Sequence, residues 1–174
     1  MKLILTSFKK NLLIFLFLIS ISSFSSLSSS KHNGVVVTRH HLATEVGSNI
    51  LLDGGNAFDA SISVAFALAV VNPSAGNIGG GGFALLYDAN KKTIESIDYR
   101  ERAPENAKEN MFLDENGNVI KGLSTSSFLA SGIPGTVDGM FMIHEKYGSI
   151  PMKKLMSPAI NLAEKGFILS KFQA

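Results

Sequence analysis

Apolar residues in the N-terminal part of the chain occur in two patterns, a contiguous run and a helical repeat. The valine run at 35–37 is continuous and β-branched, which predicts a short buried strand. In the next segment Leu42, Val46 and Ile50 recur every four residues, as on one face of an amphipathic helix. The glycine pair at 54–55 is the expected end of that helix.

The segment from Ala57 to Val71 is the most apolar part of the chain after its first thirty residues, and it predicts a buried helix. Asn56 is a suitable N-cap, and Asp59 places a negative charge in the first turn, where the helix dipole favours it. Since the segment is apolar on nearly every face, we expect neighbouring elements to cover it on all sides. It is shorter than the roughly 20 residues that span a bilayer, and Pro73 should end it.

A glycine-rich stretch, NPSAGNIGGGGF at 72–83, separates this helix from a predicted β-hairpin. The residues FALLYD, 83–88, predict the first strand, and KKTIESIDYR, 91–100, alternates in character as a second strand. The two residues between them predict the turn. We therefore expect a helix, then the glycine run, then a hairpin in this part of the chain.

The segment 101–125 is rich in loop-forming residues, and Asn116–Gly117 predicts a tight turn within it. A Gly-Pro-Gly turn then leads into a helix expected over 136–147, which Gly148 should close. Two short helical pieces are predicted after it. Pro151 and Pro158 lie in their first turns and Gly166 ends the second.

Residues 1–30 predict a secretory signal peptide, which leaves 31–174 as the remaining domain. A basic front is followed by an apolar run at 12–21 and a serine-rich tail. The run is about half of the roughly 20 residues that a membrane-spanning helix needs. An uncleaved anchor is the alternative. We favour cleavage, after which no stable membrane span would remain. The signal peptide therefore predicts an exported protein, either periplasmic or extracellular.

Composition and charge exclude several kinds of function. The chain has 174 residues, of which 45% are hydrophobic, so it can bury the core of one domain. It has no cysteine, which excludes disulfides, thiolate metal sites and a cysteine nucleophile. The 16 basic and 14 acidic residues give +2, but the first thirty residues hold three lysines and no acid, so the remainder carries −1. A nucleic-acid partner would need a basic patch, and none is expected.

The glycine run resembles a phosphate-binding loop, but its neighbours argue against that function. Gly79, Gly81 and Ala84 fit a loose dinucleotide fingerprint, which needs a strand before it and a helix after it. Here the predicted helix precedes the run and the strand follows. No Gly-Lys-Ser/Thr sequence follows, as a P-loop would require. We favour a junction at which the backbones of two layers approach closely.

The histidines do not follow a metal-binding pattern. His40 and His41 are expected at a strand end, where adjacent side chains point to opposite faces. His144 is expected on the polar side of a helix, and His32 lies in the tail of the leader. No H-x-x-x-H pair, acid–histidine spacing or G-x-S-x-G elbow occurs. We therefore predict no metal site.

A cluster of charges occurs in the sequence DYRERAP, 98–104, where the second strand enters a loop. Loops that follow strands often carry binding residues. The arginines, Arg100 and Arg102, each present a planar fork that matches a carboxylate. A surface ion-pair cluster, which contributes little stability, is the alternative. On the residues alone, that alternative is favoured.

Five segments of the chain, in this order, resemble one known family. They are HHLATEVGSNILLDGGNAFDASISVAFALAVVNPSAGNIGGGGF, DYRERAP, MFLDENGNV, LASGIPGTVDGM and YGSIPMKKLMSPAINLAEKGF. From about Val35 to the last residue, the chain closely resembles the N-terminal part of the γ-glutamyltransferases, also called γ-glutamyl transpeptidases or glutathione hydrolases. No single segment is decisive, but their order and spacing are specific.

The resemblance implies an α+β fold, namely the first strands and helices of the αββα sandwich of N-terminal-nucleophile hydrolases. These enzymes are made as inactive precursors that cut themselves into a large and a small subunit. The new N-terminal threonine of the small subunit attacks γ-glutamyl compounds such as glutathione, and its free α-amine can act as the base. The acyl group then passes to water, an amino acid or a peptide. No cofactor and no metal are implied.

Arg100 is the one substrate-binding residue that the resemblance assigns. By position it resembles the family arginine that grips the α-carboxylate of the γ-glutamyl group, and this reverses the preference for a surface ion pair. The family's oxyanion glycines belong to the small subunit, so Asn77 and the glycine run are expected to support the fold around the site. His41 stands where the family often has proline.

The family's large subunit runs to several hundred residues, so the threonine nucleophile is expected outside these 174 residues. No residue here is assigned a catalytic role, and we expect the chain alone to be inactive with exposed apolar surface. The leading hypothesis is the N-terminal segment of an exported γ-glutamyltransferase, which works with a separately encoded remainder of the large subunit and the small subunit. The alternative is a non-catalytic secreted remnant or interaction domain of a truncated gene.

Overall fold

The computed structural model describes residues 34–75, 78–171 and 173–174. The predicted signal peptide, His32 and Asn77 lie outside these residues. In the described part of the chain, no helix is both long and apolar enough to cross a membrane.

Helix α3 (Ala57–Val71) is the central element, and its bounds confirm the predicted helix. It begins with a capping box: the Asn56 side chain accepts hydrogen bonds from the backbone of Phe58 and Asp59, and the Asp59 carboxylate accepts from the Asn56 N–H at 3.0 Å. This arrangement satisfies donors that the first turn would otherwise leave free. The helix ends at Val71, and its C-cap, Asn72, directly precedes Pro73.

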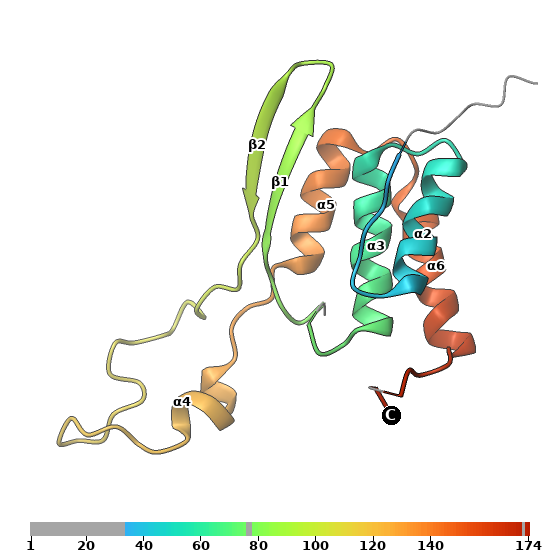
Figure 1. The fold of residues 1–174 in the computed structure, drawn as a ribbon. Coiled ribbons are helices and arrows are strands. Elements are labelled where there is room, and N and C mark those ends of the chain that lie inside the picture. The colour runs from blue at the N-terminus through green and yellow to red at the C-terminus, as the bar shows by residue number, and fades with distance from the viewer. Residues whose placement is uncertain (1–33, 76–77, 172) are drawn as a thin grey trace, which may run out of the picture. The chain divides into compact units, whose positions relative to one another are not determined.

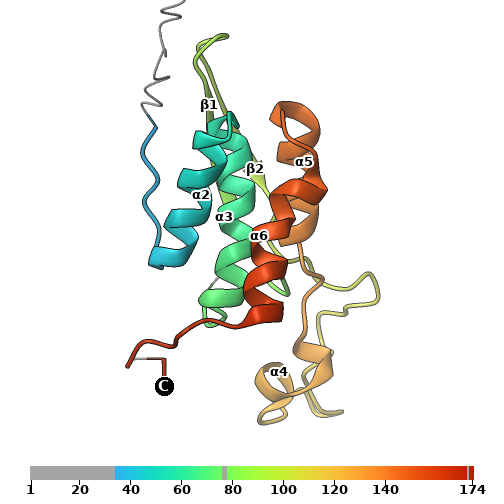
Figure 2. The same ribbon diagram turned by 90° about the vertical axis from the view of Figure 1, so that its right-hand side faces the viewer.

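Three helices pack against α3 (Figures 1 and 2). They are α2 (His41–Leu52), α5 (Thr136–Tyr147) and α6 (Met152–Lys165). The bounds of α2 and α5 confirm the predicted helices. Their contacts with α3 form a core that includes Ile50, Ile62, Phe66, Ile143 and Leu155. Burying each such side chain stabilises the fold by about 1.5–3 kcal/mol.

Strands β1 (Phe83–Asp88) and β2 (Thr93–Asp98) form the predicted antiparallel hairpin, but two details of the prediction are wrong. Asp88 pairs with Thr93, so the turn spans 89–92 instead of two residues, and β2 is shorter than the predicted 91–100. On one face of the hairpin, Leu86 and Ile97 belong to the same core as α3. The other face carries exposed apolar side chains. They are Phe83, Leu85, Tyr87 and Ile94. The expected exposed apolar surface is therefore confirmed on this hairpin.

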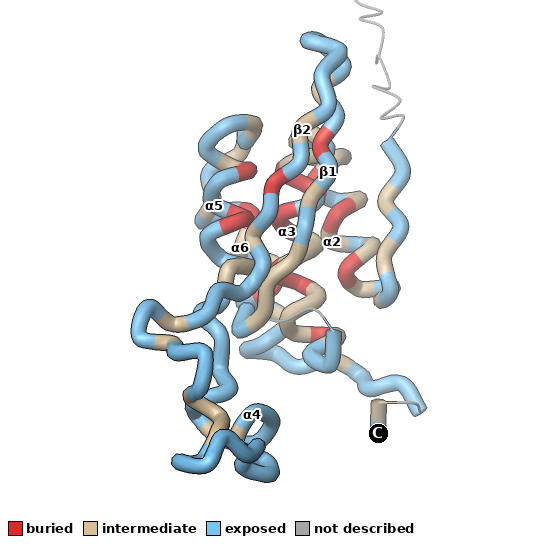
Figure 3. The backbone as a smooth tube through the Cα atoms, turned by 90° about the vertical axis from the view of Figure 1, so that its left-hand side faces the viewer, coloured by how far each residue is buried: buried red, intermediate tan, exposed pale blue. Residues whose placement is uncertain are grey.

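The segment between the hairpin and α5 is mostly irregular, as predicted. It contains a short helix, α4 (Leu123–Ser126), and a 3-10 helix at Phe128–Ala130. The Asn116–Gly117 turn is confirmed, because Gly117 has a φ of 82°, which glycine adopts without strain. Most of this segment is exposed (Figure 3).

The predicted strand at 35–37 is wrong. Val35 and Val37 are 86% and 87% exposed, and only Val36 packs inward, against Gly47 of α2. A strand needs a neighbour to take its backbone hydrogen bonds. Among the described residues the sheet contains β1 and β2 alone, so the valine run has no strand to pair with.

The predicted cover of α3 is only partly confirmed. Ile62, Ala67 and Val71 are fully buried, but Ser61 is exposed and the flank that includes Ala69 is half-buried. Three helices and one hairpin are too few to surround a helix that is apolar on nearly every face.

The two predicted short helices are one helix, α6, with Pro158 inside it. A proline in a helix removes one hydrogen bond, here to the carbonyl of Lys154, and is more often found in the first turn. Leu155 and Ala159, on either side of Pro158, are both buried in the core. Packing of this face keeps the helix continuous. Gly166, with a φ of 73°, ends it as expected.

We expect Pro158→Ala to stabilise the chain by about 1–2 kcal/mol. This is less than the roughly 3 kcal/mol propensity difference, because proline also restricts the unfolded chain. The midpoint of urea unfolding measures the gain. Ser157→Ala, on the exposed neighbour, is the control and should change stability by less than about 0.5 kcal/mol. A loss of stability in Pro158→Ala would show that the proline ring contributes packing that outweighs its missing hydrogen bond.

Candidate functional site

Arg100 lies two residues after β2, and its side chain extends into solvent with 61% of its surface exposed. Its backbone N–H donates to Asp98 Oδ1 at 3.0 Å. Its guanidinium contacts Glu101, with Nε 3.4 Å from Oε2, and lies over the Phe83 ring at 5.7 Å from the centroid. These are weak, solvent-screened contacts, so the guanidinium is available to bind another anion.

A cavity of about 440 Å³ adjoins Arg100. Its wall comes from the segment after β2 and from the irregular segment before α5, so it joins parts of the chain that are about thirty residues apart. The lining residues are Arg100, Glu101, Arg102, Ala103, Pro104, Ala107, Met111, Phe112, Leu129, Ala130, Ser131 and Gly132. The cavity combines an apolar surface with a charged edge, as small-molecule sites commonly do.

The charged edge of this cavity is positive overall, because it holds two arginines and one carboxylate. Arg102 is held by its main chain, which pairs with Ile133 through N–H···O bonds of 3.2 and 2.8 Å. A carboxylate ligand would compete with Glu101 for the Arg100 guanidinium. The geometry therefore suits recognition of a small anion.

The glycine run lies directly behind this edge, which confirms the prediction of a close backbone junction. A Cβ on Gly81 would lie 2.5 Å from the Tyr99 carbonyl oxygen and 2.7 Å from the Glu101 nitrogen. The Gly80 carbonyl accepts hydrogen bonds from the backbone N–H groups of Gly135 and Thr136, at 2.9 and 3.0 Å. The run thus connects the end of the hairpin to the start of α5.

Asp59 is a buried acid whose long-range role the sequence patterns did not reveal. Its side chain is fully buried, and it accepts hydrogen bonds from Ser149 N–H at 3.0 Å, Ser149 Oγ at 2.5 Å and Ile150 N–H at 3.3 Å, besides Asn56. Burial by itself raises the pKa of this carboxyl, but the hydrogen bonds outweigh it and hold the pKa below its ordinary value. Asp59 therefore stays ionised and ties α3 to the α5–α6 connection.

Glu95 anchors the hairpin to α5, and sequence reasoning also missed this contact. Its carboxylate accepts hydrogen bonds from Lys146 Nζ at 2.5 Å and from Tyr147 Oη at 2.5 Å. The bond from Lys146, followed by that from Tyr147, lowers the pKa of Glu95. The three groups are solvent-accessible, so this anchor orients the hairpin more than it stabilises it.

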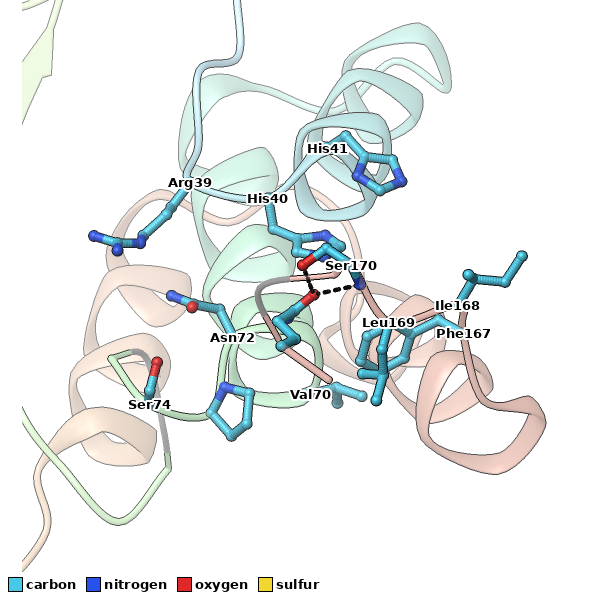
Figure 4. Close-up of a pocket in the computed structure, with 12 residues that line it drawn as sticks. Arg39, His40, His41, Val70, Asn72, Ser74, Phe167, Ile168, Leu169 and Ser170 are labelled. Carbon is cyan, nitrogen blue, oxygen red and sulfur yellow. Dashed lines mark hydrogen bonds between the residues drawn. The ribbon is translucent and has the colours of Figure 1, made fainter.

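A larger cavity, of about 850 Å³, lies elsewhere and does not include Arg100 (Figure 4). Its wall comes from the start of α2, the end of α3 and the segment after α6, where the Ser170 hydroxyl and N–H donate to Gln173 Oε1. The described lining residues include Arg39 and two histidines but no carboxylate. Size alone does not make this cavity the site. Among the described residues, neither His40 nor His41 has a carboxylate partner that would orient its ring as a base.

The expectation that His40 and His41 point to opposite faces is wrong. They begin α2 instead of ending a strand, and their rings stack with centroids 4.7 Å apart. His40 acts as the N-cap, since its Nδ1 accepts the Leu42 N–H at 3.3 Å. His144 lies on α5, half-buried, with Nε2 2.7 Å from the Ile150 oxygen. Among the described residues, no group of three or more potential ligands could hold a metal ion.

Comparison with known proteins places this geometry in context. The family profile Gamma-glutamyltranspeptidase matches residues 43–174. A glutathione hydrolase proenzyme of Pseudomonas sp. (strain A14) is 51% identical over 155 residues, and one of Escherichia coli (strain K12) is 49% identical over 137 residues. These matches cover 88% and 79% of this chain but only 27% and 23% of the relatives. The chain therefore spans about a quarter of their length.

Solved structures agree with the sequence matches. The crystal structure of Helicobacter pylori gamma-glutamyltranspeptidase is 50% identical in sequence and superposes with a TM-score of 0.77, over 80% of this chain and 40% of that one. The Bacillus anthracis transpeptidase enzyme CapD is 39% identical, with a TM-score of 0.64 and the same share of this chain. Both comparisons support a fold of mixed helices and strands.

Proposed function

The chain belongs to the gamma-glutamyltranspeptidase family, and from this premise we propose that it forms the N-terminal segment of an exported γ-glutamyltransferase. The complete enzyme would transfer or hydrolyse the γ-glutamyl group of glutathione and related compounds. In this proposal the 174 residues provide a wall of the substrate site and part of the scaffold, and the threonine nucleophile lies in the remainder of the enzyme.

The observation that carries the proposal is the placement of Arg100. A guanidinium that is 61% exposed beside a cavity of about 440 Å³, with a long contact to the Glu101 carboxylate, offers two donors to an incoming α-carboxylate. The arginine fork binds a carboxylate in one orientation, which would direct the γ-carbonyl away from Arg100. A reactive group supplied by the remainder of the enzyme would attack that carbonyl.

In the complete enzyme, the proposed nucleophile is the N-terminal threonine of the small subunit. Its hydroxyl oxygen would bond to the γ-carbonyl carbon while its own α-amine takes the proton, and the amine of the leaving group would depart with that proton. Water or an amino acid would then take the acyl group. Arg100 would hold the substrate through both steps, which lowers the entropy cost of each attack.

The fold supports a place for the chain in a larger assembly. We propose that β1–β2 and the helices are the first elements of an αββα sandwich, and that further chain covers the exposed face of the hairpin and the half-buried flank of α3. The further chain would be the remainder of the large subunit and the small subunit, encoded together with this segment or separately. The segment would act in the periplasm or outside the cell.

A chimeric enzyme tests the role of Arg100. Residues 34–174 of this chain would replace the corresponding segment of the Escherichia coli relative, which is 49% identical. We expect the chimera to process itself and to hydrolyse a γ-glutamyl anilide, and Arg100→Ala to lower kcat/KM about 30-fold, because a charge-assisted hydrogen bond contributes about 2 kcal/mol. The loss should appear mainly in KM. The segment alone should show no hydrolysis above background.

Arg39→Ala is the matched control, since it removes an exposed arginine that lines only the larger cavity. It should leave kcat/KM within about threefold, as expected for surface changes away from the site. An equal loss of kcat/KM in the two variants would show that Arg100 has no specific role in substrate recognition. A processed chimera in which Arg100→Ala keeps full activity would contradict the proposed role. A chimera that never processes, beside a parent enzyme that does, would favour the non-catalytic remnant.

A further inference from the structure

Tyr99 lies between β2 and Arg100, and its position is held by backbone hydrogen bonds. Its N–H donates to the Gly82 carbonyl at 2.9 Å, and its carbonyl accepts from the Gly82 N–H at 3.3 Å. These two bonds extend the hairpin ladder by one residue pair beyond β1 and β2. Its side chain packs, half-buried, against the main hydrophobic core.

Tyr99 packs against three glycines whose missing side chains make room for it. We call these residues, Gly82, Gly135 and Gly139, the glycine slot. A Cβ on Gly82 would lie 3.0–3.2 Å from the Tyr99 ring, and one on Gly139 would lie 2.6 Å from Tyr99 Cβ. A Cβ on Gly135 would collide with the Tyr99 carbonyl, 2.8 Å from its carbon. The slot joins the glycine run to the start of α5, and its tightness restricts the ring to few rotamers.

The side chain of Arg100 has little restraint of its own. It is 61% exposed, and its contacts with Glu101 and the Phe83 ring are long. Its backbone is confined, because a Cβ on Gly81 would lie 2.9 Å from the Arg100 carbonyl carbon. Tyr99 directly precedes Arg100 and its backbone is paired with Gly82, so Tyr99 lies where it can fix the start of the Arg100 side chain.

We propose that Tyr99 is a positioning residue whose ring, wedged in the glycine slot, sets the direction in which Arg100 presents its guanidinium to a carboxylate. The carboxylate ligand rests on the function proposed above, whereas the positioning does not. Within the part of the chain that the structure describes, no hydrogen bond involves the Tyr99 hydroxyl. The shape of the ring therefore carries the role, and phenylalanine should replace tyrosine without loss.

Amide hydrogen exchange on the full chain measures the positioning directly. Tyr99→Ala should speed exchange of the Arg100 and Arg102 amides about tenfold or more, because their bonds to Asp98 and Ile133 depend on this backbone. Tyr99→Phe should leave them within about twofold of the unchanged chain, since it keeps the ring. The amides of α6 should exchange at the same rate in all three proteins.

An NMR titration with L-glutamate adds a readout that a merely structural role would not move. The Arg100 Nε–H signal should shift and saturate in the unchanged chain and in Tyr99→Phe. In Tyr99→Ala it should need about tenfold more glutamate, because a binding group that is displaced by about 1 Å loses affinity on that order. Rescue by phenylalanine separates the ring's role from any effect of the hydroxyl.

The outcomes are distinguishable. Unchanged exchange at Arg100 in Tyr99→Ala, or faster exchange that extends equally to α6, would overturn the positioning role. Local exchange as expected, with no glutamate response in any protein, would support the positioning of Arg100 and overturn its proposed ligand. If Tyr99→Ala does not fold, Gly82→Ala provides the comparison, since it pushes on the ring by a few tenths of an ångström without removing it.

Discussion

Asp59→Ala is expected to destabilise the chain by about 3–5 kcal/mol, because it removes a buried charged acceptor and leaves its partners unpaired. Four donors lose their acceptor at once: the backbone N–H groups of Asn56, Ser149 and Ile150 and the Ser149 hydroxyl. The capping box of α3 and the α5–α6 connection loosen together. Urea unfolding followed by circular dichroism measures the loss.

Asp53→Ala is the control for this substitution. Asp53 is exposed at the end of α2, where its backbone N–H and not its side chain makes the cap bonds. Its replacement should change stability by less than about 0.5 kcal/mol. Comparable losses in the two variants would show that Asp59 contributes no more than a surface acid does, and would contradict its role as the link between α3 and the α5–α6 connection.

The same carboxylate makes stability depend on pH. The pKa of Asp59 is lowered in the folded chain, so the folded state binds its proton less readily than the unfolded state does. Its contribution is fully present above the unfolded pKa of about 3.9 and is lost as the pH falls through the folded pKa. Asp59→Asn should flatten this part of the stability profile. An unchanged slope would contradict the assignment.

Gly135→Val is expected to destabilise the chain by about 3 kcal/mol or more, because the added Cβ would overlap the main chain of Tyr99. Main-chain atoms cannot relieve such an overlap by changing rotamer, as a flexible side chain could. Gly135 has a φ of −116°, which any residue adopts, so the cost is steric. The overlap would push the hairpin away from the start of α5 and break the bonds to the Gly80 carbonyl. The urea midpoint and the near-ultraviolet signal of the tyrosines report the change.

Gly54→Ala separates this steric cost from the conformational cost of losing a glycine. Gly54 has a φ of 91° and no neighbour within 4 Å of an added Cβ. Its replacement should cost about 1–2 kcal/mol through backbone strain alone. If Gly135→Val costs no more than Gly54→Ala, the start of α5 is not tightly packed on Tyr99.

Several elements could be predicted from the sequence because their signals are local. Asn56 and Asp59 form the capping box that starts α3, and Pro73 follows its end, so the bounds of the helix depend on neighbouring residues only. The hairpin has alternating strands around a short turn. Gly148 and Gly166 end α5 and α6 in the same local way. The candidate site was predicted to the extent that the DYRERAP motif resembles a known family.

The rest depended on contacts between residues far apart in the sequence. A β-branched run becomes a strand only where a partner strand lies beside it, and 35–37 has none among the described residues. Pro158 stays inside a helix because the core holds that face of α6. The contact of Asp59 with Ser149 spans 90 residues, and no periodicity reports such a distance.

The sequence by itself determined the helices α2, α3 and α5, the hairpin and the family to which they belong, because caps, periods and ordered motifs act over short distances. Only the tertiary structure decided which segments the glycines bring together. They admit the Tyr99 ring and the backbone beside Arg100, since a Cβ at Gly81, Gly135 or Gly139 would occupy the same space. Close approach between distant segments is a property of packing. A run of glycines in the sequence permits such an approach but does not identify the segment that approaches.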